Sequence, residues 1–371
     1  MVRAGLFRLV MAALLALAGP AVAQAPAAGQ DDIFTVSDVA VDVTDATASQ
    51  AREKALLEGQ RQAFLKLMQR LATDTNVRPP RLDEATMATL VRSIDVANER
   101  TSAVRYLATL TVRFNPAAVR DVLGSAGVAF TETKARPVLV VPVYSVRGSI
   151  ILFDDRNPWR EAWARRPARD TLVPLVVPLG DLRDIGDLDA KQAMAGDTAK
   201  LEAIARRYGA VEAVVAVAAV SLDAITSKPT VALTVTRHSG DLETTLVDSF
   251  TGESADQAEA LLAKAVDWVE RELERLWKSE NAIDPGQGER QITLAVPINS
   301  LAEWTEIRRR LSGIGLIQKA EVVQLTRQEG RIAVTFSGET GQLRSALAQR
   351  DLELVEGASE SVLRLTGPVR R

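Results

Sequence analysis

A chain of 371 residues without a single cysteine cannot be held together by disulfide bonds. The absence of thiols also excludes a cysteine nucleophile, a redox pair and any cysteine-ligated zinc or iron–sulfur site. The one histidine, His238, excludes a metal site with several histidine ligands within one chain. The fold must therefore be stabilised by hydrophobic cores, and the chain is long enough for two or three of them.

The composition is that of a folded protein with no excess of positive charge. Hydrophobic residues make up 47% and charged residues 25% of the chain, as in ordinary globular domains. The formal net charge is −3, whereas proteins that bind nucleic acids usually carry an excess of positive charge.

The N-terminus has the features of a secretory signal peptide over residues 1–23. Arg3 and Arg8 supply positive charge, residues 9–18 are apolar, and residues 21–23 (Ala-Val-Ala) fit the small-x-small cleavage rule. This order of features predicts export through the inner membrane and removal of the segment.

We expect cleavage between Ala23 and Gln24, a disordered lead-in over residues 24–31, and a periplasmic protein. The apolar segment is shorter than the roughly 20 residues that a membrane helix needs, and no later stretch approaches that length. No transmembrane segment is therefore expected after cleavage.

Residues 32–134 predict a small α+β module with the order β-α-α-β-β-α and helices on one face. Its clearest signal is the strict apolar alternation of residues 104–114. An irregularity is expected in the first strand between Val36 and Val39. The other predicted elements are a strand over residues 34–43, a long helix over 47–73, a short helix over 82–92, and a helix from Asn115 to Gly124.

Residues 135–283 predict a mixed α/β sheet domain. Residues 138–143 form an apolar run typical of a strand buried on both faces, and residues 172–179 repeat the pattern. The remaining predicted elements are a helix over 189–208 ended by Gly209, strands over 211–222, 230–237 and 242–250 with a hairpin turn at Ser239-Gly240, and a long helix over 254–278 lying across the sheet.

A linker over residues 281–290, rich in proline and glycine, precedes a third module over residues 290–366. The predicted order there is β-α-β-β-α-β, the ferredoxin-like split βαβ, with Ser300 as the cap of its first helix. Two short strands, over residues 352–355 and 362–365, are expected to finish the sheet. This arrangement hosts many unrelated functions and assigns none.

Four longer motifs of the chain resemble those of a known protein family. They are ATASQAREKALLEGQRQAFLKLMQRL at residues 46–71, RNPWREAW at 156–163, PLVVPLGDLRD at 174–184 and LAVPINSLAEW at 294–304. Together with the signal sequence they resemble the bacterial family described as domain of unknown function 2066. The resemblance implies a secreted envelope protein, and the family offers no catalytic or binding residues to carry over.

A second, more local likeness lies within the middle module. The stretch IARRYGAVEAVVAVAAV at residues 204–220 is similar to the helix–glycine–strand step in the periplasmic domains of the TolB and CsgG envelope proteins. That similarity implies a role in envelope assembly.

Most candidates for chemistry have a structural explanation. His238 would need a partner and a nucleophile to act as a base, and a position in an exposed turn is the simpler interpretation. The aspartates of residues 180–189 do not match the spacing of a calcium loop and are better read as caps of short turns. Carboxylate pairs could be drawn from Asp154, Asp155, Glu243 or Asp248, but their spacing singles out no pair.

The segment RNPWREAWARRPAR, residues 156–169, is the one candidate interaction patch. Asn157 caps a helix on which two tryptophans lie four residues apart among several arginines. The residues of this patch are Trp159, Arg160, Trp163, Arg165 and Arg166. Tryptophan and arginine favour interfaces, although both indoles could instead anchor the helix to the sheet. We expect Trp163 to be buried and Trp159 to lie nearer the surface.

Two functions from different classes fit these patterns. The favoured one is a non-enzymatic interaction or assembly module of the cell envelope, whose partner is an envelope protein or an anionic envelope ligand. The alternative is a hydrolase that uses a carboxylate pair at a module boundary, which predicts a deep cleft holding two acids with raised or split pKa values. Neither needs a cofactor, and the sequence leaves the oligomeric state and the partner's identity open.

Overall fold

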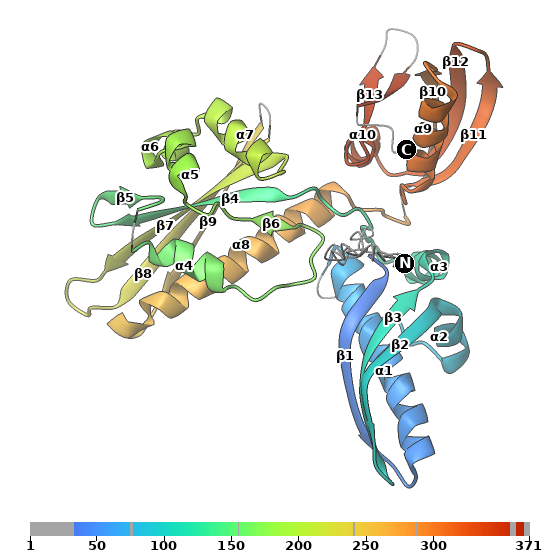
Figure 1. Cartoon of the computed structure of the whole chain (residues 1–371), viewed down its shortest axis with the longest axis horizontal. Helices are drawn as coiled ribbons and strands as arrows, with labels where there is room; N and C mark the ends of the chain where they lie inside the picture. The colour runs from blue at the N-terminus through green and yellow to red at the C-terminus, as the bar shows by residue number, and fades with distance from the viewer. Residues whose placement is uncertain are drawn as a thin grey trace, which may run out of the picture. The chain divides into compact units, whose positions relative to one another are not determined.

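The computed structural model describes residues 33–74, 77–154, 156–239, 242–286, 288–356 and 361–366. These residues form three sheets of three, six and five strands, each built from one continuous stretch of the chain (Figure 1). Helices accompany every sheet, so the fold has the mixed α/β and α+β character predicted from the sequence. The expected signal peptide and lead-in, residues 1–31, lie outside the described residues.

The three-stranded sheet is antiparallel, and its strands in spatial order are β1 (Thr35–Thr44), β3 (Arg105–Phe114) and β2 (Val91–Thr101). The predicted irregularity in the first strand is confirmed, because the pairing register shifts between Val36 and Val39. Along β3 every second side chain is buried, as the alternating sequence predicts.

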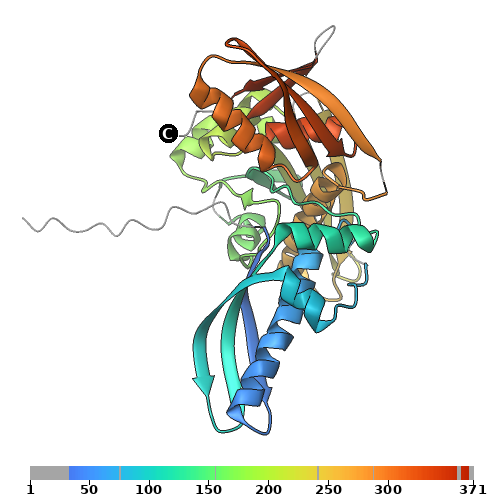
Figure 2. The same ribbon diagram turned by 90° about the vertical axis from the view of Figure 1, so that its right-hand side faces the viewer.

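Helix α1 (Ala48–Leu71) lies along this sheet against β1 and β3 (Figures 1 and 2). Gly59 allows the close approach, since a Cβ there would come within 2.3 Å of the Leu110 side chain and 2.9 Å of that of Val41. Two shorter helices complete this part of the chain: α2 (Glu84–Leu90), capped by Asp83, and α3 (Pro116–Ser125), capped by Asn115.

The six-stranded sheet supports the segment of the candidate interaction patch, residues 156–169. Its order is β5-β4-β7-β8-β9, and the very short β6 also pairs with β4. Strand β4 runs parallel to β6 and β7, and the other pairings are antiparallel. The strands are β4 (Val138–Val146), β5 (Ser149–Ile151), β6 (Leu175–Val176), β7 (Glu212–Leu222), β8 (Pro229–Ser239) and β9 (Leu242–Thr251).

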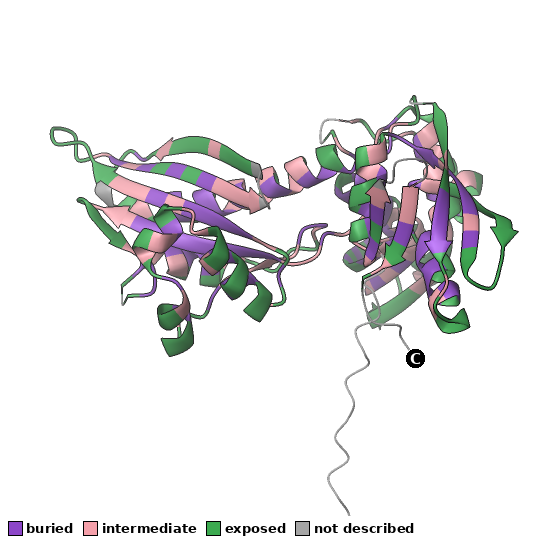
Figure 3. Cartoon of the chain, turned by 90° about the horizontal axis from the view of Figure 1, so that it is seen from above, coloured by how far each residue is buried: buried purple, intermediate pink, exposed green. Residues whose placement is uncertain are grey.

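Helices cover both faces of this sheet. On one face α4 (Pro158–Arg165) and the long α8 (Ala258–Glu280) close a core that includes both tryptophans of α4. On the other face α6 (Ala190–Met194) and α7 (Thr198–Arg207) cover β4 and β7, preceded by α5 (Leu182–Asp187). Burial is therefore greatest in the central strands and falls toward β9 (Figure 3).

Three details of this part of the chain differ from the prediction. The helix predicted over residues 189–208 is divided into α6 and α7, because Gly196 adopts a positive φ of 66° and Asp197 caps a new helix. Of the strand predicted over residues 172–179, only Leu175–Val176 pairs with β4. Strand β8 runs through Ser239, which pairs with Leu242, and residues 240–241 lie outside the described residues.

The five-stranded sheet has the order β11-β12-β10-β14-β13. The predicted β-α-β-β-α-β order is present, and both strands predicted after the second helix are found, as β13 and β14. Strand β14 lies between β10 and β13 and runs parallel to β10. Its elements are β10 (Glu289–Pro297), α9 (Leu301–Ser312), β11 (Ile317–Leu325), β12 (Glu329–Ser337), α10 (Thr340–Ala348), β13 (Leu352–Glu356) and β14 (Ser361–Leu365). Ser300 caps α9 as predicted, its hydroxyl accepting a hydrogen bond from the backbone N–H of Glu303 at 3.1 Å.

None of the helices in the described ranges combines the length and apolar character needed to cross a membrane.

Candidate functional site

Helix α4 begins where the sequence predicts, at an asparagine followed by proline. The Asn157 side chain accepts a hydrogen bond from the backbone N–H of Arg160 at 3.0 Å and donates one to the carbonyl oxygen of Leu152 at 2.7 Å. Pro158 occupies the first helical position, where its missing N–H costs nothing. Asn157 is itself buried, so the cap fixes the start of the helix against the body of the protein.

Both tryptophans of α4 are fully buried against the six-stranded sheet. Their rings meet edge to face at 5.6 Å, a favourable arrangement for two aromatic rings. The indole N–H of Trp159 donates to the carbonyl oxygen of Ala216 in β7 at 2.9 Å. The expectation that Trp159 lies nearer the surface is therefore wrong, because this hydrogen bond requires its ring to be inside the core.

The three arginines of the candidate patch have different environments. Arg165 is exposed and pairs with Glu161 at 2.8 Å and with Glu259. Arg160 is half-buried and donates to the carbonyl oxygen of Phe153 at 3.3 Å. No carboxylate of the described ranges lies within 4.0 Å of its guanidinium, so its positive charge has no partner there.

Arg166 is the most constrained of the three arginines. Its guanidinium donates to the carbonyl oxygens of Trp163 at 3.0 Å and Leu175 at 2.8 Å. It also stacks 5.4 Å from the Trp163 ring centroid and lies 3.3 Å from a carboxylate oxygen of Glu270. Arg166 therefore ties α4 to both β6 and α8.

A pocket of about 830 Å³ opens beside these residues, a size typical of small-molecule sites. One wall is the extended segment 173–179, in which every residue is valine, leucine or proline. The charged groups at the pocket are Arg160, Glu161, Arg166, Arg169 and Glu270. Within the candidate patch, Arg160, Trp163 and Arg166 line this pocket, whereas Trp159 and Arg165 do not.

Glu270 is the buried acid of this pocket, with a side chain only 10% exposed. Burial raises the pKa of its carboxyl above the ordinary value, although the charges of Arg169 and Arg166 oppose the change. Its Oε2 atom and the indole N–H of Trp163 have no hydrogen-bond partner in the described part of the chain. Glu270 Oε2 lies 3.5 Å from the Arg169 guanidinium, so this acid is paired. Within the described ranges, the indole N–H of Trp163 and the charge of Arg160 have no such partner.

Sequence reasoning missed Glu270 as a member of this site. It lies on α8, next to Val269 of the buried stripe, about a hundred residues from Arg166 along the chain. The only available signal was an acid at the border of an apolar stripe, and such residues are common on surface helices.

His238 does not occupy an exposed turn. It lies in β8, is half-buried, and contacts Gly196 in the break between α6 and α7. Its neighbour across the strand pair is Glu243, an exposed acid. A small pocket of about 210 Å³ adjoins these residues.

Two aspartates of residues 180–189 act as helix caps, as predicted. Asp181 caps α5 and Asp189 caps α6, each in a reciprocal capping box. Asp184 is fully buried, pairs with Arg207 and accepts a hydrogen bond from the Tyr208 hydroxyl at 2.8 Å. This buried carboxylate joins α5 to α7 and has a structural explanation.

None of the described acids considered for a hydrolase is buried. Asp154, Glu243 and Asp248 are each exposed, and Asp155 lies outside the described residues. In the ranges that the structure describes, no group of three or more histidine or acidic side chains could hold a metal ion.

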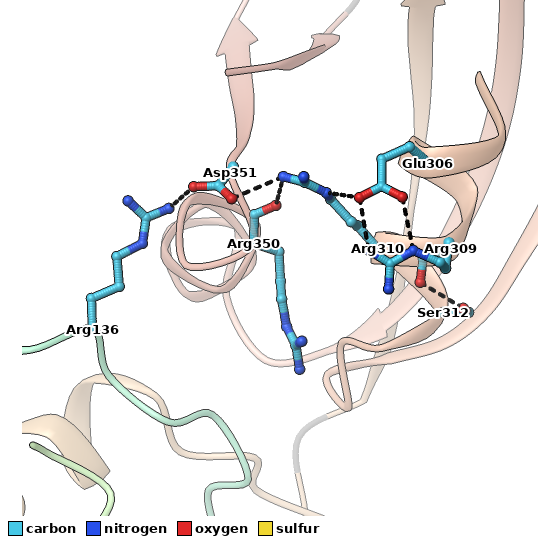
Figure 4. A network of polar contacts seen from close by, with 7 residues as sticks. All are labelled: Arg136, Glu306, Arg309, Arg310, Ser312, Arg350 and Asp351. Carbon is cyan, nitrogen blue, oxygen red and sulfur yellow. Dashed lines mark hydrogen bonds and ion pairs between the residues drawn. The ribbon is translucent and has the colours of Figure 1, made fainter. Parts of the chain in front are cut away.

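A second polar network surrounds Glu306 of α9 (Figure 4). Arg309 and Arg310 both donate to its carboxylate, at 2.7 to 2.8 Å, and these hydrogen bonds lower the pKa of Glu306 to about 2. Arg310 also donates to Asp351 at 2.9 Å, and Asp351 accepts from Arg136. Each charge here has a protein partner, so the network is a structural one.

Comparison of the chain with family models, with curated proteins and with solved structures gave no match.

Proposed function

We propose that this protein is a non-enzymatic binding protein of the cell envelope, and that the pocket beside α4 receives an anionic amphiphile. The observation that carries the proposal is the combination of an apolar wall, residues 173–179, with Arg160, whose charge has no acidic partner in the described ranges. A ligand with an alkyl chain and an anionic head group would match both features.

The electrostatics of the pocket support an anionic ligand. Three arginines and two glutamates line it, which leaves one net positive charge. Arg166 and Arg169 are engaged by Glu270, so among the described arginines of the pocket Arg160 is the one available to a head group.

The envelope location rests on the N-terminal sequence and on the resemblance to secreted bacterial proteins. Sequencing the N-terminus of the protein purified from fractionated cells tests it. We expect Gln24 as the first residue and recovery in the periplasmic fraction. Recovery of Met1 on membrane-bound protein would contradict the location.

Calorimetric titration with dodecyl phosphate tests the binding function, with uncharged dodecyl maltoside as the control ligand. Replacing Arg160 by Gln should weaken dodecyl phosphate binding about tenfold, the effect of losing one charge-assisted hydrogen bond. Arg165→Gln is the matched control, because Arg165 is on the same helix and does not line the pocket.

Binding should also weaken as salt rises, since part of it is electrostatic. Equal affinity for the two detergents, or equal losses in the two arginine variants, would show that the pocket does not select an anion.

A further inference from the structure

Strand β9 is an edge strand with a long, regular and unused side. It pairs with β8 over all ten of its residues without a register shift, and with no other strand of the described chain. Its other side therefore presents a row of backbone N–H and C=O groups to solvent, which is a template for pairing with another strand.

The other sheet edges carry features that discourage such pairing. Register shifts interrupt β1, β2 and β11, and bulges of this kind twist an edge away from a partner. Strands β5, β6 and β13 have only three, two and five residues. Among the edges in the described ranges, β9 alone is both long and regular.

Strand β9 also lacks the proline and lysine that often protect an edge strand. The strand contains no proline, lysine or arginine, and its charged residues are Glu243 and Asp248. Val247 is 70% exposed on the face that α8 does not cover, whereas Leu246 and Phe250 pack partly against the core beneath α8. The packing of Leu246 and Phe250 thus fixes which face of β9 is turned toward α8. Val247, at the centre of the strand, remains exposed on the opposite face.

An antiparallel pairing of β9 with its own copy, centred on Leu246, gives complementary neighbours. It places Leu246 against Leu246 of the other copy and Val247 against Thr245. In the same register the acids meet hydroxyls, because Glu243 faces Ser249 and Asp248 faces Thr244. No two carboxylates lie directly opposite, so the register avoids the repulsion that like charges would cause.

We propose that two copies of this chain associate through β9, joining two six-stranded sheets into one continuous sheet about a two-fold axis. The inference goes beyond the binding function and does not depend on it. Because a single strand pair is a small interface, we expect a dimer that dissociates in the micromolar range.

Sedimentation equilibrium of the purified protein across a concentration series tests the association. Val247→Lys should weaken it about tenfold, because a lysine in the middle of an edge strand blocks pairing. Val323→Lys is the matched control: Val323 is 64% exposed on the edge strand β11, where a change should leave the association unaltered.

The absence of cysteine allows the register to be tested directly. Thr245→Cys and Val247→Cys variants, mixed under mild oxidation, should form a disulfide between copies faster than either variant alone, because the proposed register places these two positions opposite each other. A monomer at all concentrations, equal effects of Val247→Lys and Val323→Lys, or no advantage of the mixture would each overturn the proposal.

Discussion

Trp159 and Trp163 differ in one contact, although both indoles are completely buried on the same short helix. The N–H of Trp159 is bonded to Ala216 in β7, whereas that of Trp163 has no partner in the described structure. Burial alone would give the two residues equal importance. The hydrogen bond makes Trp159 the residue that positions α4 on the sheet, and leaves Trp163 at the pocket.

Phenylalanine substitutions should separate the two tryptophans. Both changes remove ring volume, but only Trp159→Phe leaves a buried carbonyl without its donor, so it should cost about 1 kcal/mol more than Trp163→Phe. Trp159→Ala should cost about 3–5 kcal/mol. Urea unfolding of the variants gives these free energies, and equal costs for the two phenylalanine variants would contradict the assigned hydrogen bond.

Glu306 should make the stability of the protein depend on acid pH. Its pKa is about 2 in the folded chain, well below the ordinary 4.5, because Arg309 and Arg310 bond to its charged form. The stabilisation is therefore complete above about pH 4.5 and is lost as the pH falls toward 2.

Urea midpoints at pH 5, 4 and 3 should fall less steeply in Glu306→Gln than in the unchanged protein. Glu303→Gln is the control, since Glu303 is a half-buried acid of the same helix and forms no ion pair within the described ranges. Identical slopes in the unchanged protein and Glu306→Gln would show that this carboxylate does not carry the effect.

At the scale of elements, the sequence predicts those helices and strands that are determined by interactions between neighbouring residues. The alternation of β3, the caps Asn115, Asn157 and Ser300, and the apolar stripe of α8 all identify their elements in the sequence. Each of these signals depends on residues within a few positions of one another. In the structure these particular elements are present, and only their ends differ slightly from the predicted bounds.

Features that depend on distant contacts could not be predicted. The extended segment 173–179 pairs with β4 over only two residues, and its remaining residues line the pocket wall. The position of β14 beside β10 depends on pairing between strands that are far apart in the sequence, so the pattern of neighbouring residues does not predict it. Glu270 joins the pocket through the three-dimensional meeting of α8 with α4, so the candidate site could be found from the sequence only in part.

The break between α6 and α7 gives a prediction at this scale. Gly196→Ala should destabilise the protein by about 1–2 kcal/mol, the cost of a side chain in the left-handed region, which Gly196 occupies at φ 66°. The added Cβ would also lie 2.8 Å from Cε1 of His238. Gly186→Ala within α5 is the control, because nothing lies within 4 Å of its Cβ position, and urea unfolding should show no loss.

At the scale of the whole molecule, the two proposed contacts use opposite ends of the six-stranded sheet. Strand β9 lies at one end of the strand order, and β6, which borders the pocket, pairs with β4 toward the other end. Pairing of two chains through β9 would therefore leave both pockets open at the outer ends of the joined sheet. Ligand binding and association should then be independent, each unchanged when the other is disrupted.

The central claim is that the pocket beside α4 binds an anionic amphiphile, and the indole N–H signals test it most directly. The chain has five tryptophans, and their indole groups can be followed one by one in an ¹⁵N correlation spectrum with single Trp→Phe assignments. We expect dodecyl phosphate to shift the signal of Trp163, which lines the pocket, and to leave that of Trp304 in α9 unchanged. A spectrum in which Trp163 does not move at saturating ligand, or moves equally with dodecyl maltoside, would contradict the claim.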